Sequence, residues 1–218
     1  NMALTAEQIQ KNYDKHLKII DTYITDRKDL VLSMLKSMED NYVMAPASGR
    51  TWYHNAFAGG YVDHVLRVIK CAKELHKTWN LMGAIDSDFT EEELMFSALN
   101  HDLGKIGDRE FPYYIPNPSE WHRKNQNSAF KINPELYYMD VTDRALWLLN
   151  QYGIKYSQNE MLTFIHENKF SIIYKRRQEL SESTAIEYHV DHIIPIQGEN
   201  VCGLHVPWNL QIIYGGHF

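Results

Sequence analysis

Residues 99–108 have the sequence LNHDLGKIGD, and the adjacent pair His101 and Asp102 at its centre predicts a metal site. Neighbouring side chains on a helix point about 100° apart, so both can reach one ion only where the helix ends. Gly104 and Gly107 favour such an ending. An imidazole beside a carboxylate suits Fe, Mn, Zn or Mg and leaves coordination positions for water.

A second stretch, GGYVDHVLRV at residues 59–68, places His64 at the start of a predicted helix with apolar periodicity. Taken alone, each histidine also fits a core residue on an apolar helix face. Together, the Gly-Gly-preceded histidine and the His-Asp doublet followed by Gly-Lys resemble the HD-domain metal-dependent phosphohydrolases. These are all-helical enzymes in which one histidine, a His-Asp doublet and a late aspartate hold one or two metal ions.

The resemblance implies roles for several residues. His64, His101 and Asp102 would bind a divalent metal (Mn, Fe, Mg or Zn), and Asp102 would also serve catalysis by bridging two ions. Lys105 and Arg67 are candidates to neutralise phosphate charge. The implied substrate is a nucleotide or a related phosphate ester. Some HD proteins oxidise through a di-iron centre, so the reaction type stays open.

The late aspartate of the family has several candidates in this sequence. Asp143 begins a predicted helix over residues 143–149, and we assign it as a candidate metal ligand. His166, within a predicted helical stretch at residues 160–169, is another candidate. The other aspartates after the doublet are Asp108, Asp140 and Asp191.

Residues that precede or follow the metal motifs are candidates for substrate binding. The segment 39–58 is predicted to be a loop leading into the first metal helix, and 111–118, rich in Pro and Tyr, an irregular lid-like segment. The stretch WHRKN at 121–125 resembles phage-encoded HD proteins; a solvated loop explains it equally well. The substrate-binding candidates are His54, His122, Arg123 and Lys124, with Arg50 beside them.

Apolar periodicity predicts the remaining helices of the first part of the chain. Residues 5–24 and 26–38 are expected to be packing helices, and Thr5 with Gln8 forms a capping box for the first. A third helix is expected over 60–79, and a fourth begins at a Thr90–Glu93 capping box and ends at the doublet. The buried face expected for the third helix consists of Val62, Val65, Leu66, Ile69, Ala72, Leu75 and His76.

The sequence changes character near residue 165. The segments EYHVDHIIPI (187–196) and GLHVPWNLQII (203–213) resemble the core of phage HNH endonucleases, which use a small β-β-α metal finger. The resemblance implies that Asp191 binds a metal, that His192 activates the attacking water and that Asn209 orients the histidine.

Two further features bear on this C-terminal segment. Lys175, Arg176 and Arg177 are a candidate DNA contact, although a charged helix face explains them more simply. The closing helix of the finger would follow Ile213, where few residues remain, so we expect an incomplete β-β-α unit. His217 is the only histidine after Asn209.

Composition favours an ordinary globular chain. Of its 218 residues, 44% are hydrophobic and 23% charged, and the net charge of −6 disfavours a broad nucleic-acid-binding face. Cys71 and Cys202 suit unpaired thiols in a reducing compartment. With no apolar run long enough for a bilayer and no secretory signal, we expect a cytoplasmic protein without membrane contact, and the sequence leaves a homo-oligomer open.

The sequence therefore predicts a mainly α chain of two parts. Residues 1–165 are expected to form an HD-type helical bundle, and 166–218 an HNH-like segment with a short β-hairpin. The leading hypothesis is a metal-dependent phosphohydrolase. The alternatives are an HNH-type DNA endonuclease and a catalytically incomplete remnant of both families.

Overall fold

The computed structural model describes residues 3–83, 89–160, 176–192 and 210–214. The chain divides into two compact units, Asn1–Glu160 and Met161–Phe218. The described residues are mainly helical and contain two separate antiparallel β-hairpins. The expected division between residues 165 and 166 falls outside the described residues.

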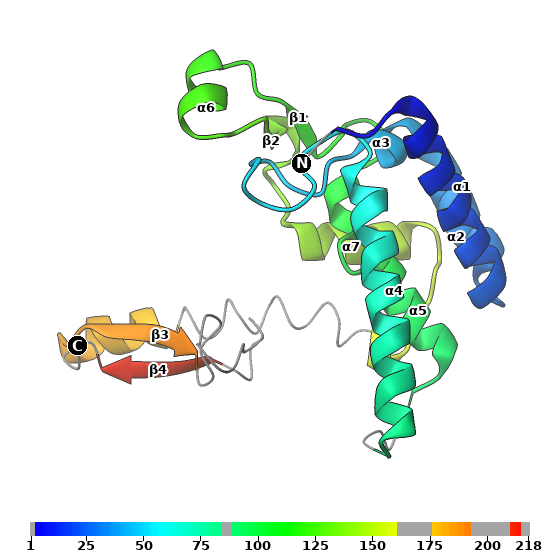
Figure 1. The fold of residues 1–218 in the computed structure, drawn as a ribbon. Coiled ribbons are helices and arrows are strands. Elements are labelled where there is room, and N and C mark those ends of the chain that lie inside the picture. The colour runs from blue at the N-terminus through cyan, green and yellow to red at the C-terminus, as the bar shows by residue number, and fades with distance from the viewer. Residues whose placement is uncertain (1–2, 84–88, 161–175, 193–209, 215–218) are drawn as a thin grey trace. The chain divides into compact units, whose positions relative to one another are not determined.

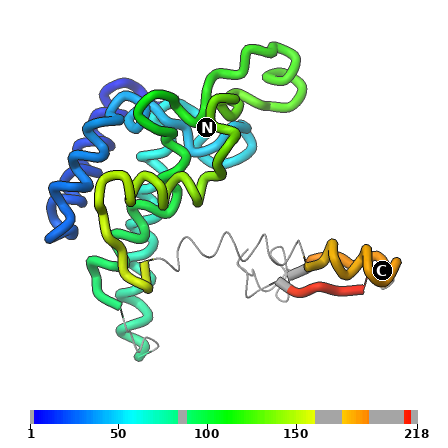
Figure 2. The backbone as a smooth tube through the Cα atoms, turned by 180° about the vertical axis from the view of Figure 1, so that it is seen from behind, coloured from blue at the N-terminus to red at the C-terminus, as the bar shows by residue number. Residues whose placement is uncertain are grey.

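Three helices open the first unit. Helix α1 (Ala6–Tyr23) has the predicted capping box, because the Thr5 and Gln8 side chains each accept a hydrogen bond from the other's backbone N–H. Helix α2 (Lys28–Ser37) lies beside α1, as Figures 1 and 2 both show. The prediction of a loop from residue 39 was wrong at its start, where α3 (Glu39–Met44) forms. Two acidic residues in its first turn favour the helix, and its Tyr42 is buried.

The long helix α4 (Gly60–Leu81) runs beside α5 (Glu91–Asn100) (Figure 1). The predicted Thr90–Glu93 capping box begins α5. On α4, Val62, Val65 and Ile69 are buried as expected. The prediction that Leu75 is buried was wrong, since the side chain is 51% exposed.

Between the doublet and the next long helix, the chain forms a small hairpin that periodicity did not predict. Strand β1 (Tyr114–Pro116) pairs with β2 (Phe130–Ile132), so the segment 111–118 is not wholly irregular. Strands of three residues are too short to show an alternating pattern. The excursion between them contains α6 (Glu120–Asn125), and it extends away from the long helices in both Figure 1 and Figure 2. The WHRKN stretch is therefore helical, with Ser119 as its cap.

The predicted helix after the hairpin is α7 (Val141–Gln151), preceded by the 3-10 turn η2 (Pro134–Leu136). Its start packs closely on the 3-10 turn η1 (Leu103–Ile106) that follows the doublet. A Cβ atom at Gly104 would lie 1.9 Å from the Val141 carbonyl oxygen, so only glycine permits this approach. The core between the helices is apolar; its fully buried members include Ile20, Met34, Tyr61, Phe96, Leu103, Ile106 and Leu148.

In the second unit, the described residues form a helical segment at 176–184 and one hairpin. Strand β3 (Tyr188–His192) pairs antiparallel with β4 (Leu210–Tyr214), and the register places His192 opposite Leu210. The expected C-terminal hairpin is therefore present. Asn209, Lys175, His166 and His217 lie outside the described residues.

Candidate metal centre

The His-Asp doublet lies where α5 ends. His101 is the last residue with helical dihedrals, at φ −54° and ψ −32°, and Asp102 turns away at φ −114° and ψ 15°. This turn brings His101 Nε2 to 3.6 Å from Asp102 Oδ2, although the two residues are adjacent. Gly107, at φ +96°, ends η1 in the left-handed half of the backbone map that glycine tolerates.

His64 joins the doublet from the second turn of α4. Its Nε2 lies 3.1 Å from His101 Nε2 and 3.4 Å from Asp102 Oδ2. Three potential ligand atoms, contributed by α4 and by the turn that ends α5, therefore converge within 3.6 Å of one another. Their side chains are only partly exposed, at 19% for His64, 22% for His101 and 7% for Asp102.

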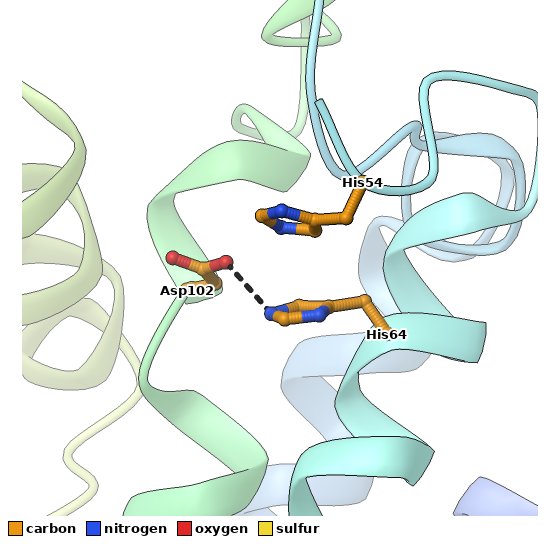
Figure 3. Close-up of side chains that lie close together, drawn as sticks. All are labelled: His54, His64 and Asp102. Carbon is orange, nitrogen blue, oxygen red and sulfur yellow. Dashed lines mark ion pairs between the residues drawn. The ribbon is translucent and has the colours of Figure 1, made fainter. Parts of the chain in front are cut away.

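The structure places His54 among the candidate metal ligands, which differs from the role expected from the sequence. It was expected to bind substrate, but its ligand atom lies within 4.8 Å of those of His64 and Asp102. Figure 3 shows its ring above that of His64, with both beside the carboxylate; the two ring centroids are 4.4 Å apart. His64 and Asp102 thus belong to two overlapping triplets, one completed by His101 and the other by His54.

A buried asparagine holds His54 in this position. Asn55 adopts φ +53°, and its Nδ2 donates to Gly60 O at 3.1 Å and to Asp63 Oδ2 at 2.9 Å. The loop carbonyl of Asn55 approaches α4 so closely that a Cβ at Gly60 would lie 2.2 Å from it. Gly60, the first residue of α4, therefore permits the contact that brings His54 over His64.

Arg67 is engaged with this supporting network. Its Nη2 lies 2.8 Å from Asp63 Oδ2, the same oxygen that accepts from Asn55, and its side chain is 68% exposed. Asn12 on α1 donates to the other Asp63 oxygen at 3.3 Å. Arg67 thus helps to fix the carboxylate that orients the loop.

The site carries a negative carboxylate, and the pKa values of two of its imidazoles are lowered. Burial raises the pKa of Asp102, but the hydrogen bond from His64 and the charge of Lys105, whose Nζ lies 2.8 Å away, more than offset burial, and the pKa is well below its usual range. Burial lowers the pKa of His101 and, together with the neighbouring His64, that of His54. Both imidazoles are therefore neutral near pH 7 and have a lone pair to offer.

These atoms fit a divalent cation. The Ala98 carbonyl lies 2.8 Å from His101 Nδ1 and can only accept, so Nδ1 carries the proton and Nε2 presents its lone pair to the cluster. With metal–ligand bonds of about 2.0–2.2 Å, neighbouring ligand atoms are about 3.3–3.6 Å apart around a tetrahedral ion and about 2.8–3.1 Å apart around an octahedral ion. The observed separations of 3.1, 3.4 and 3.6 Å lie within the range that these two geometries span. The donor set of imidazole and carboxylate suits Zn, Fe or Mn.

Other predicted site residues of the first unit lie elsewhere. Asp143 is exposed on the first turn of α7, where its backbone N–H is capped by Asp140, and it is outside the cluster that the described residues form. On α6, His122 contacts Ser119, Arg123 donates to the Asn117 carbonyl and Lys124 pairs with Glu120. These contacts are local to α6 and its flanks.

In the second unit, Asp191 and His192 end strand β3. Asn209 directly precedes β4 in the sequence but lies outside the described residues.

The chain matches none of the protein-family models, curated proteins or solved structures with which it was compared. Among the helices of the described residues, none combines the length and apolar character needed to cross a bilayer. The chemistry of the side-chain cluster therefore carries the functional argument.

Proposed function

We propose that the first unit is a metal-dependent phosphohydrolase of the HD type, acting on a nucleotide or a related phosphate ester. One observation carries the proposal: His64, His101 and Asp102 bring three ligand atoms within 3.6 Å of one another. The two histidines are partly exposed, so a phosphate ester in solution can reach the cluster. Mainly helical architecture is consistent with the HD fold.

The residues of the site would have different roles in this reaction. His64, His101 and Asp102 would hold the cation, and His54 is close enough to add a fourth ligand or to accept a proton from an attacking water. When bound, a divalent cation supplies charge stabilisation to the phosphoryl oxygens and lowers the pKa of a coordinated water. Lys105, 20% exposed beside Asp102, would neutralise a phosphate oxygen.

Hydrolysis of phosphate esters tests the proposal. Purified chain supplied in turn with Mn, Fe, Mg and Zn should release phosphate from nucleoside monophosphates or p-nitrophenyl phosphate. His101→Ala should reduce that rate at least about 100-fold, because a ligand of the cation is lost. A parent without phosphatase activity in any of the four metals would contradict the proposal.

A second candidate, favoured by the β3–β4 hairpin, is a metal-dependent DNA endonuclease in the second unit. Asp191 and His192 end β3, and Arg176 and Arg177 lie in the helical segment that precedes the hairpin. Nicking of plasmid DNA by the parent, lost in His192→Ala and retained in His101→Ala, would support this candidate. Nicking that is lost in His101→Ala and retained in His192→Ala would assign the activity to the helical unit.

A further inference from the structure

We infer that the turn at Arg50–Tyr53 is a base-stacking subsite, which gives the metal centre a preference for phosphate esters that carry a nucleobase. The inference rests on the proposed phosphohydrolase and names the residues that select its substrate. The nucleobase next to a phosphate could belong to a free nucleotide or to the end of a single strand. Both sources present a base and an adjacent phosphate to the site.

The loop that carries this turn is closed by its own hydrogen bonds. Ala47 N donates to Asn55 O at 3.0 Å, and Ser48 Oγ donates to His54 O at 2.7 Å. At the tip, Tyr53 N donates to Arg50 O at 3.0 Å, which forms a β-turn. The loop is therefore compact, and its backbone conformation is held by its own hydrogen bonds.

The loop is also anchored to the β1–β2 hairpin. Phe130 N donates to Gly49 O at 3.0 Å, Thr51 N donates to Asn127 O at 2.8 Å, and Arg50 forms an antiparallel bridge with Ser128. A Cβ at Gly49 would lie 2.9 Å from Phe130 O, so glycine permits this pairing. These backbone hydrogen bonds therefore fix the position of the turn relative to the β1–β2 hairpin.

Two aromatic rings on this turn remain exposed. Trp52 is 56% exposed and Tyr53 54%, and their ring centroids are 6.5 Å apart in an edge-to-face arrangement. The Arg50 guanidinium lies 5.6 Å from the Trp52 ring centroid. Large exposed aromatics on a fixed turn, with an arginine beside them, are the side chains that stack nucleobases and contact their phosphates.

The turn leads directly into the metal cluster. Tyr53 precedes His54, whose ring stacks on His64. Consecutive Cα atoms are about 3.8 Å apart, so the Cα of Trp52 lies within about 8 Å of that of His54. A base on Trp52 or Tyr53 would leave its own phosphate within reach of the cluster.

The test compares matched ligands on the parent and on two tryptophan variants. Equilibrium dialysis with added Mn²⁺ measures the affinity for the non-hydrolysable phosphonate analogues of adenosine monophosphate and of ribose 5-phosphate, the second of which lacks the base. We expect the parent to prefer the nucleotide by about 5- to 150-fold, the range for stacking one base on an aromatic side chain. Trp52→Leu should reduce this preference to about threefold or less. Trp79→Leu is the control, since Trp79 is 51% exposed but lies 15 residues beyond His64 on α4, about 22 Å along the helix.

Either of two results would overturn the subsite: no preference for the nucleotide in the parent, or a preference that Trp52→Leu leaves intact. Hydrolysis of the two natural esters, adenosine monophosphate and ribose 5-phosphate, separates this failure from that of the proposed function. Equal hydrolysis of both esters, unaffected by Trp52→Leu, refutes the subsite and leaves the hydrolase. Nucleotide preference that is lost in Trp52→Leu, without hydrolysis of either ester, supports the subsite and refutes the hydrolase.

A five-nucleotide single strand with a terminal phosphate distinguishes the two sources of the base. Trp121, 59% exposed on α6, offers a further ring on the excursion of the hairpin to which the turn is anchored. If the ligand is a strand, it should bind more tightly than the mononucleotide, and Trp121→Leu should remove that gain. If the two bind equally and Trp121→Leu has no effect, the subsite takes a free nucleotide.

Discussion

The first unit contains two groups of side chains that differ in chemistry. One surrounds a single buried histidine, and the other consists of histidines around a carboxylate. His16 on α1 is 1% exposed, hydrogen bonds to the hydroxyl of Tyr42 and packs edge-on against that ring at 5.3 Å. His64 and His101 are about one-fifth exposed and converge on the carboxylate of Asp102. Both groups lie on helices with apolar faces, so the helix pattern alone does not separate them.

The difference lies in what each imidazole can do with its lone pair. Burial lowers the pKa of His16 to about 3, and its Nε2 is engaged by a tyrosine, so it serves as a neutral core residue. The Nε2 atoms of His64 and His101 point toward each other and toward an anion, an arrangement that a shared cation would stabilise. Histidines whose Nε2 atoms converge on a carboxylate are therefore the candidate metal ligands, whereas a buried histidine bound to a tyrosine is a core residue.

The largest expected effect is on metal binding, and it tests this distinction directly. His64→Ala and His101→Ala should each weaken Zn²⁺ or Mn²⁺ affinity by about 100-fold or more, beyond the 10- to 100-fold typical of residues that only support a ligand. His16→Gln, which keeps a polar partner for Tyr42, should leave the affinity unchanged. Isothermal titration of the three variants and the parent measures it. An equal loss in His16→Gln would show that the two groups are not distinct.

The next effect is the contribution of His16 to the pH dependence of stability. Unfolded His16 takes up a proton near pH 6.5, whereas the folded residue resists protonation down to about pH 3. The unfolded state therefore binds more protons in this window, so stability is lost as the pH falls below 6.5. From pH 7 to 5 the group should contribute a loss of about 2 kcal/mol.

Chemical denaturation of the parent and His16→Gln at both pH values measures that contribution as the difference between their pH slopes. Working in a metal chelator removes the contribution of any ion bound at the other cluster. Parallel slopes for the two proteins would mean that His16 is protonated in the fold, contrary to its buried position.

Local patterns in the sequence predicted much of the helical architecture. The capping boxes at Thr5 and Thr90 were confirmed, because each depends on residues three positions apart. The motifs also predicted His64, His101 and Asp102 as metal ligands, and the structure places these three side chains together. The exposed position of Leu75 was missed, because periodicity predicts which face of a helix is apolar but not how far along the helix its neighbours extend.

The position of His54 could not be predicted in the same way. It depends on the positive φ of Asn55, on the approach of the Asn55 carbonyl to Gly60 and on the hydrogen bond to Asp63. These contacts join a loop to a helix, and no periodic pattern encodes them. The signal in the sequence was a polar Asn after the histidine and a Gly-Gly pair before the helix, which is consistent with many loops.

A smaller effect is expected from the residue that positions His54. Asn55→Gly keeps the left-handed backbone accessible but removes the hydrogen bonds to Gly60 and Asp63. We expect metal affinity to fall by about 10-fold, the lower end of the range for a supporting residue. Titration calorimetry measures it, and His54→Ala supplies the comparison. If His54→Ala binds metal like the parent, His54 is no ligand and the loop serves the substrate alone.

The smallest effect has the opposite sign. Lys105 Nζ lies 2.8 Å from Asp102 Oδ2, so its charge competes with a cation for that carboxylate. Lys105→Met keeps most of the apolar stem and should raise metal affinity about threefold, a modest value because the ammonium is partly solvated. Lys36→Met is the matched control, since Lys36 pairs with Glu39 on the surface. A gain in affinity together with slower phosphate release would mean that the same ammonium serves the substrate when the cation takes its carboxylate. A fall in metal affinity would instead show that Lys105 supports the ligand geometry of Asp102.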